Sequence, residues 1–110
     1  MSVRTRFAPS PTGYLHIGSL RTVLYCFLWA RHNNGQFILR VEDTDRARFV
    51  EDAIDKVIEV LDVVGMTPDE GPHHDGGFGP YIQTERLDIY TPRLHGLCDQ
   101  GDAYYCFCTS

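Results

Sequence analysis

The chain has 110 residues and a formal net charge of −5 at pH 7, from 10 basic and 15 acidic side chains. This length suits one domain or part of one, and it is short for an enzyme that must hold several substrates. The acidic balance argues against a surface that binds nucleic acid through bulk positive charge, so any RNA contact must be local.

Membrane and secretory segments are not expected. No apolar run approaches the roughly 20 residues that a spanning helix needs, and the first residues lack the apolar core of a signal peptide. We therefore expect a cytoplasmic protein with no membrane partner. In that compartment the four cysteines are expected to be thiols or metal ligands rather than disulfides.

The first half of the chain predicts strand, helix, strand and helix. Residues 3–8 read as a strand that the prolines at 9 and 11 end. Apolar residues spaced three and four apart predict a helix from Leu20, with Ser19 as N-cap and a stop at 33–35. A second strand is expected at 37–41, and a second helix from Val50 to Leu61 that ends before Gly65.

The second half is less regular. The Gly- and Pro-rich stretch 67–80 is expected to be a loop, long enough for a functional or mobile role. Thr84 is a candidate cap for a third helix that stops at Gly101, and Pro92 is expected to kink it or to restart it at Thr91. Residues 103–107 read as a third strand.

This order of elements predicts an α/β fold: the first half of a doubly wound, Rossmann-like parallel sheet with flanking helices. Ligands of such sheets bind beyond the carboxyl ends of the strands. Residues 9–19 and 42–45 both leave from such ends, so we expect one site there. Residues 15–19 form a strand-to-helix turn whose free N–H groups suit a phosphate. The plain alternative is that Gly13 and Gly18 shape a loop and His16 is merely exposed.

Residues 6–19 read RFAPSPTGYLHIGS, which is similar to the first signature of class I aminoacyl-tRNA synthetases in the bacterial glutamyl form. Ser19 departs from the general signature, which ends in His. Ala8-Pro9-Ser10 resembles bacterial glutamyl enzymes, whereas glutaminyl and archaeal-type glutamyl enzymes have Pro-Pro-Glu there. Further likeness runs through 40–48, 69–72 and 79–86, and so covers nearly the whole chain.

The resemblance implies that residues 1–110 are the N-terminal part of a class I catalytic, nucleotide-binding domain. It implies a glutamate–tRNA ligase, which uses ATP with Mg²⁺ to activate L-glutamate as glutamyl-adenylate and transfers it to the 3′ end of tRNA(Glu). The full-length enzyme would be a monomer. The lysine-rich second signature that clamps ATP phosphates is absent from this sequence, so the 110 residues alone are expected to be inactive.

Roles for individual residues also follow from the resemblance. Arg6 would pair with the side-chain carboxylate of glutamate, a task that suits a bidentate cation. Glu42 would hold the α-ammonium, and Ala8 and Ser10 would add short contacts. Without the resemblance, Arg6 reads as a surface arginine and Glu42 as an ordinary ion-pair partner.

ATP would be bound by Thr12, His16 and Gly18, with His16 and Gly18 acting in catalysis as charge develops on the α-phosphate. Thr44 and Arg48 would meet the acceptor end of tRNA; alternatively, the alternating Asp and Arg residues form a self-paired, solvated turn.

Cys106 and Cys108 resemble the first half of a zinc site, near 106–110, where an inserted acceptor-binding domain would begin. Two thiolates cannot complete a tetrahedral Zn²⁺ site, so an ordinary pair of thiols is the alternative.

Two other functions compete. The related enzyme that glutamylates a modified nucleoside of tRNA(Asp) shares the early motif but tends to read Glu-Asp-Leu-Asp where this chain has Glu-Asp-Thr-Asp at 42–45. A non-catalytic nucleotide-binding module is the second.

Overall fold

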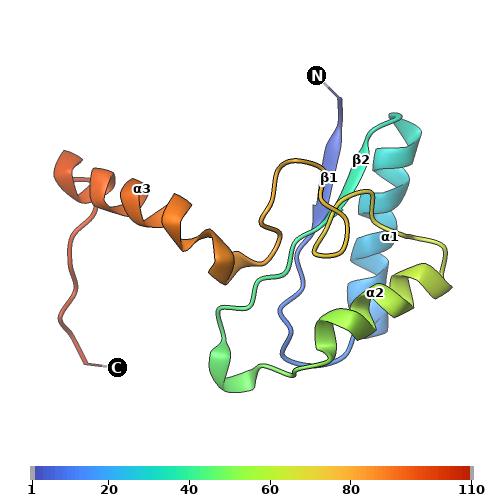
Figure 1. Ribbon diagram of the computed structural model, residues 1–110, viewed down its shortest axis with the longest axis horizontal. Helices are drawn as coiled ribbons and strands as arrows, with labels where there is room; N and C mark the ends of the chain where they lie inside the picture. Colours follow the sequence, from blue (N-terminus) through green and yellow to red (C-terminus); the bar gives the residue numbers. More distant parts are fainter. Residues whose placement is uncertain (1, 110) are drawn as a thin grey trace.

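Two parallel strands and the helix between them form the centre of the molecule. The computed structural model describes residues 2–109. Strand β1 (Arg4–Phe7) pairs with β2 (Gln36–Leu39) in parallel, with Arg4 opposite Gln36 and Phe7 opposite Leu39. Helix α1 (Ile17–His32) connects them and lies along the sheet (Figure 1). The predicted parallel α/β half-sheet with flanking helices is confirmed.

One face of the sheet carries the core. Side chains alternate along a strand, so Phe7, Phe37 and Leu39 point to one side and are buried. There they meet α1 and α2 (Ala53–Val63), which contribute Val23, Ala30, Val57 and Leu61, and Met66 completes the cluster. The other face carries the charged residues of β1.

Helix α1 begins three residues earlier than predicted, because His16 and not Ser19 is its N-cap. His16 has an extended backbone, and its Nδ1 accepts the N–H of Gly18 at 3.1 Å, which ends the loop and starts the helix at Ile17. The predicted stop is confirmed: Asn33 is the C-cap, and Asn34 has a φ of 49°.

Helix α2 also keeps its predicted end but begins later. It starts at Ala53 rather than Val50: residues 51 and 52 form a turn, and the N–H of Val50 donates to the carbonyl of Pro11 at 2.9 Å. Beyond its C-terminus Gly65 has a φ of +73°, which suits a glycine that ends a helix.

The loop 67–80 contains no helix or strand but follows β2 closely. The N–H of Asp69 donates to the carbonyl of Phe37 at 2.8 Å, and the N–H of Leu39 donates to the carbonyl of Glu70 at 2.9 Å. The loop is therefore tied to the sheet at its start. Whether it has a functional or mobile role stays a prediction.

Two details of the third helix differ from expectation. A short 3₁₀ helix, η2 (Gln83–Arg86), leads directly into α3 (Leu87–Gln100), so Thr84 caps nothing and instead donates to Asp43. Pro92 lies inside α3, and the helix does not restart at Thr91. Pro92 lies near the N-terminus of α3. The backbone hydrogen bond that it cannot donate would go to the carbonyl of Asp88 in the first turn.

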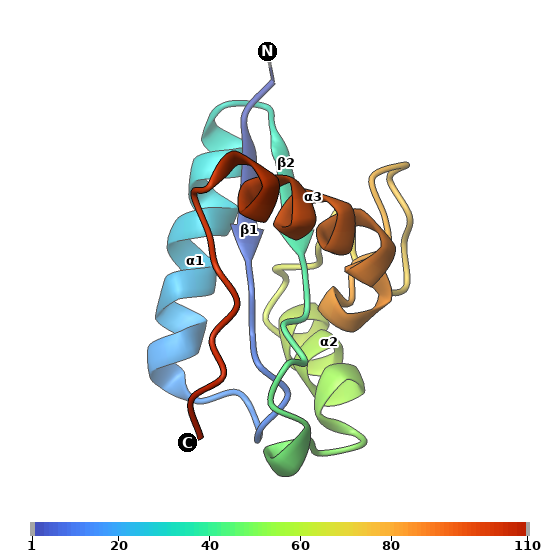
Figure 2. The same ribbon diagram turned by 90° about the vertical axis from the view of Figure 1, so that its left-hand side faces the viewer.

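The predicted strand at 103–107 is wrong. These residues form no strand and are mostly exposed, including Tyr104 and Phe107. A strand needs a neighbour for its backbone N–H and C=O groups. In Figure 1 this tail lies beyond α3, away from β1 and β2, so no such neighbour is available. Figure 2 shows α3 crossing in front of β1 and β2, with the tail descending from its end.

None of the helices between residues 2 and 109 is both long and apolar enough to cross a membrane.

Candidate functional site

The segments that follow β1 and β2 lie side by side, as their parallel strands predict. The N–H of Arg40 donates to the carbonyl of Phe7 at 3.0 Å, and the N–H of Glu42 donates to the carbonyl of Pro9 at 2.9 Å. Farther along, the bond from Val50 to Pro11 joins the same two segments. The two sequence motifs therefore meet beyond the carboxyl ends of the strands.

Arg6, Arg40 and Glu42 form a charged group on the face of the sheet opposite α1. Glu42 Oε1 accepts from Arg6 Nη1 at 3.1 Å and from Arg40 Nη2 at 3.3 Å. The Arg6 and Glu42 side chains are 43% and 34% exposed. Partly exposed pairs of this kind contribute about 0–1 kcal/mol, so ligand charges can replace them at little cost.

A hollow of about 420 Å³ lies beside the loop that follows β1. Its lining includes four residues with predicted roles: Ala8, Ser10, Thr12 and His16. The volume is within the usual range for a small-molecule site. Arg6, Gly18 and Glu42 are not among its lining residues, so the ion group and the hollow are neighbouring features joined through Pro9.

His16 holds the start of α1 with its ring. Nδ1 accepts the Gly18 N–H, which puts the proton of the neutral imidazole on Nε2, 3.1 Å from Ser19 Oγ. A Cβ at position 18 would lie 3.0 Å from His16 Cε1, so glycine is what lets the ring approach. The imidazole thus accepts the hydrogen bond of the Gly18 N–H, which could otherwise donate to a phosphate oxygen.

Comparison with known proteins decides the family. The model of the class I tRNA synthetases (E and Q), catalytic domain, matches residues 2–110. The chain belongs to this family.

Similar proteins include the glutamate–tRNA ligases of Chloroherpeton thalassium, 60% identical over 108 residues, and Clostridium kluyveri, 59% identical over 107. These matches cover 98% and 97% of this chain but only 22% of each relative. The crystal structure of a glutamate tRNA ligase from Elizabethkingia meningosepticum, in complex with its amino acid, superposes with a TM-score of 0.87 at 50% identity. The superposition covers 90% of this chain and 20% of the Elizabethkingia chain. The chain therefore spans about a fifth of the length of these relatives.

Within this synthetase domain, the turn after β2 pairs with itself. The Arg48 guanidinium forms an ion pair with Asp45, and the Arg48 N–H donates to Asp45 Oδ1 at 3.3 Å. Thr44 is exposed in the same segment. This is the self-paired arrangement weighed above, and the role of Thr44 and Arg48 toward tRNA stays a prediction.

Asp43 is a buried residue of the synthetase motif whose structural role the sequence did not reveal. It is 3% exposed and accepts from the Thr84 N–H at 2.9 Å and from Thr84 Oγ1 at 2.5 Å. Arg46 Nη1 lies 3.5 Å from Oδ2, the oxygen that also accepts from the Thr84 hydroxyl. Asp43 therefore ties the chain after β2 to the start of η2, 41 residues later.

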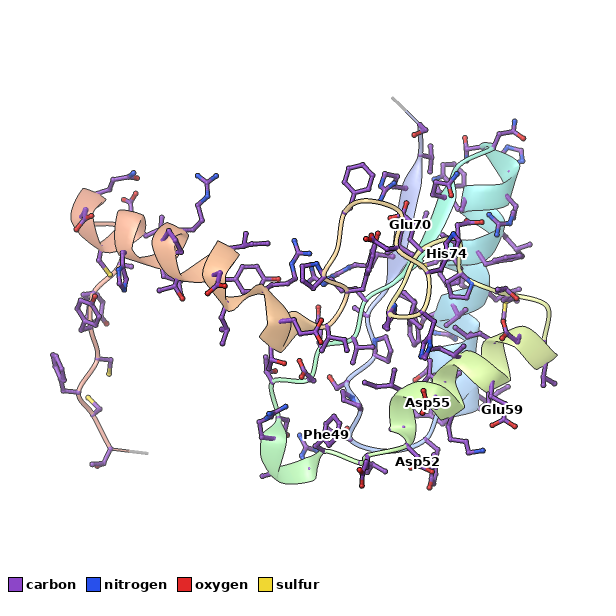
Figure 3. The ribbon with its side chains drawn as sticks, viewed as in Figure 1. Phe49, Asp52, Asp55, Glu59, Glu70 and His74 are labelled. Carbon is purple, nitrogen blue, oxygen red and sulfur yellow. The ribbon has the colours of Figure 1, made fainter. Side chains whose placement is uncertain are left out.

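A second buried charge, Glu70, was also missed. Both Nη atoms of Arg4 donate to its carboxylate at 2.6 and 2.7 Å, and Tyr81 Oη donates to it at 2.7 Å. The bonds from Arg4, opposed by burial, lower the pKa of Glu70. Burial and then the bond to Glu70 raise the pKa of Tyr81. Figure 3 shows Glu70 beside β1 and β2, well away from the labelled acidic residues of α2 and its N-cap, Asp52, Asp55 and Glu59.

Cys106 and Cys108 are exposed in the tail. Hydrogen bonds from the backbone and side chain of Cys108 lower the pKa of the Cys106 thiol. Among residues 2–109, no three His, Cys, Asp or Glu side chains come together as a metal site. The two thiols supply a donor type that Zn²⁺ accepts, but only two of the four ligands it needs.

Proposed function

We propose that this chain is the glutamate- and ATP-binding part of a glutamate–tRNA ligase. The family match over 2–110 supports a class I catalytic domain, and the relatives support glutamate as the amino acid. The observation that carries the proposal is the pairing of Arg6 with Glu42 next to the hollow beside His16. Glutamate has a carboxylate for one of these side chains and an ammonium for the other.

Binding of glutamate would exchange this ion pair for two contacts with the ligand. Arg6 turns its guanidinium to the side-chain carboxylate, which it can meet with two parallel N–H groups. Glu42 receives the α-ammonium, and Ala8 and Ser10 add short contacts from the strand end. A specific ligand with both charges satisfies both side chains, whereas glutamine leaves Arg6 without its anion.

ATP, bound with Mg²⁺, would lie near Thr12, His16 and Gly18. An oxygen of the glutamate α-carboxylate forms a bond to the α-phosphorus, and the bond to the pyrophosphate oxygen breaks. Negative charge grows on the α-phosphate oxygens, and the Nε2–H of His16 can donate to them. No covalent enzyme intermediate is needed, because the step depends on positioning and charge stabilisation.

The remaining parts of the reaction belong to the longer protein. Thr44 and Arg48 would contact the acceptor end of tRNA(Glu), and an inserted acceptor-binding domain would begin near 106–110. Cys106 and Cys108 would supply half of a Zn²⁺ site there. We further propose that the complete ligase acts as a monomer in the cytoplasm and that residues 1–110 alone do not charge tRNA.

The test places the 110 residues in a host enzyme. They replace the matching 108 residues of the Chloroherpeton thalassium ligase, and charging of tRNA(Glu) with glutamate is measured. Arg6→Gln should lower kcat/KM for glutamate by about 30-fold or more, since truncating one partner of a specific charged contact costs about 2–5 kcal/mol. Normal charging by this variant, or charging by the isolated chain, would contradict the proposal. Glutamylation of a tRNA(Asp) nucleoside instead would favour the related modifying enzyme.

A further inference from the structure

Arg40 donates to the same carboxylate oxygen as Arg6, from the segment that follows β2. Arg6 lies on β1, and Arg40 and Glu42 follow β2 two residues apart, so all three side chains project from one face of the sheet. Both arginines donate to Glu42 Oε1. No other donor among residues 2–109 reaches this carboxylate, which leaves Oε2 open for a ligand.

We propose that Arg40 is a positioning residue of the glutamate site, which keeps the Glu42 carboxylate in place when Arg6 leaves it for the substrate. This inference rests on the proposed function. Arg6 has two partners to choose from, Glu42 and the incoming carboxylate. Arg40 is the cation that stays with Glu42, so that Oε2 remains directed to the α-ammonium.

The charge of the group supports this assignment. Arg6 and Glu42 alone are neutral, whereas adding Arg40 gives the group a net charge of +1. Glutamate carries a net charge of −1. The net charge of the three side chains therefore balances that of the ligand, whereas the neutral pair of Arg6 and Glu42 does not. A site with this charge also attracts glutamate more strongly than neutral glutamine, which adds to selectivity.

Among residues 2–109, Arg40 forms one ion pair, with Glu42. Its side chain is 26% exposed, and its Nε is buried with no hydrogen-bond partner. A donor left in this state opposes folding. Arg40, which follows β2, also borders a hollow of about 460 Å³ beside α3, together with Tyr90 and Arg93. A guanidinium whose one ion pair among residues 2–109 is with Glu42 fits a positioning role.

The first experiment uses the host chimera and a chemical probe. Arg40→Gln should raise KM for glutamate about tenfold, with KM for ATP unchanged, and Arg40→Lys should recover part of the loss because it keeps the charge. Inhibition by glutarate, which lacks the α-ammonium, should weaken much less. Arg21→Gln is the matched control, because Arg21 is an exposed arginine of α1 away from the charged group.

A double-mutant cycle tests whether Arg40 acts through Glu42. In a chain that already carries Glu42→Gln, Arg40→Gln should change KM for glutamate by less than twofold. Full additivity, or an equal loss for glutamate and glutarate, would overturn the inference. If the unsubstituted chimera charges no tRNA, the proposed function fails; if it charges tRNA and Arg40→Gln changes nothing, only this inference fails.

A second measurement needs no catalysis. In the isolated 110-residue chain, NMR relaxation of the arginine Nε groups should show Arg40 ordered and Arg21 mobile. Glu42→Gln should make Arg40 more mobile and leave Arg21 unchanged. An Arg40 side chain as mobile as Arg21 in the unsubstituted chain would overturn the inference, whatever the chimera does.

Discussion

Replacing Glu70 with Gln should unfold the chain at much lower denaturant. The substitution removes the negative charge at position 70, while Arg4 still directs two N–H groups at this position. The glutamine amide places its own NH₂ donor opposite one of these two N–H groups. Breaking a buried pair costs about 3–5 kcal/mol, but the Arg4 side chain is 32% exposed, so solvent recovers part of this cost. We expect a loss of about 2–3 kcal/mol, out of about 5–15 for a domain of this size.

Urea unfolding followed by circular dichroism measures the effect. With an m-value of about 1.5 kcal/mol/M, the midpoint should fall by about 1.3–2 M. Glu59→Gln is the control, because the Glu59 side chain is 61% exposed and pairs with Lys56 at the surface, so the midpoint of this variant should hardly move. Equal midpoints for Glu70→Gln and Glu59→Gln would refute the reasoning.

The pH dependence provides an independent check. Because the pKa of Glu70 is lower in the folded chain than its ordinary value of about 4.5, the unfolded chain takes up this proton first as the pH falls. The stabilisation is therefore complete above about pH 4.5 and is lost as the pH falls through the lower folded pKa. The stability difference between the unsubstituted chain and Glu70→Gln should shrink over that acidic range and be constant near neutrality.

Two further predictions concern other contacts. Thr84→Val should destabilise the chain by about 1.5–3 kcal/mol, because it removes the hydroxyl donor from the buried Asp43 carboxylate. Thr22→Val is the control in the same urea titration. It removes only a hydrogen bond of 3.4 Å at the surface and should have little effect. Cys106 should be alkylated by iodoacetamide faster than Cys98 at pH 7.5, because hydrogen bonds from Cys108 favour its thiolate; peptide mass spectrometry gives both rates, and equal rates would contradict the pKa shift.

The parallel half-sheet and its helices could be predicted because local patterns determine them. Helical spacing of apolar residues identified α1 and α2, a mostly apolar run of strand length identified β2, and the prolines at 9 and 11 marked the end of β1. Errors occurred where a distant partner decides the outcome. Residues 103–107 have the composition of a strand but no neighbouring strand, and Thr84 resembles a helix cap but is taken by Asp43.

Site residues were predictable as a motif but not as contacts. The order of the elements placed Arg6, His16 and Glu42 at one edge of the sheet. Nothing in the sequence separates Arg40, which joins the Glu42 carboxylate, from the other arginines of the chain. Glu70 was hidden in a Gly- and Pro-rich loop, and its burial depends on Arg4, 66 residues earlier. Such pairs become visible only when the chain is folded.

His16 has a structural role that the sequence did not suggest, in addition to the role proposed for it toward ATP. As the N-cap of α1 it satisfies the Gly18 N–H, which would otherwise be one of the unpaired donors of the helix start. A phosphate oxygen is a better acceptor for that N–H, because it is charged and interacts favourably with the positive end of the helix. Under the proposed function, ATP replaces one acceptor with a stronger one and releases the imidazole, whose Nε2–H is then free for the reacting phosphate. The helix keeps its cap in both states, so the exchange leaves the fold intact.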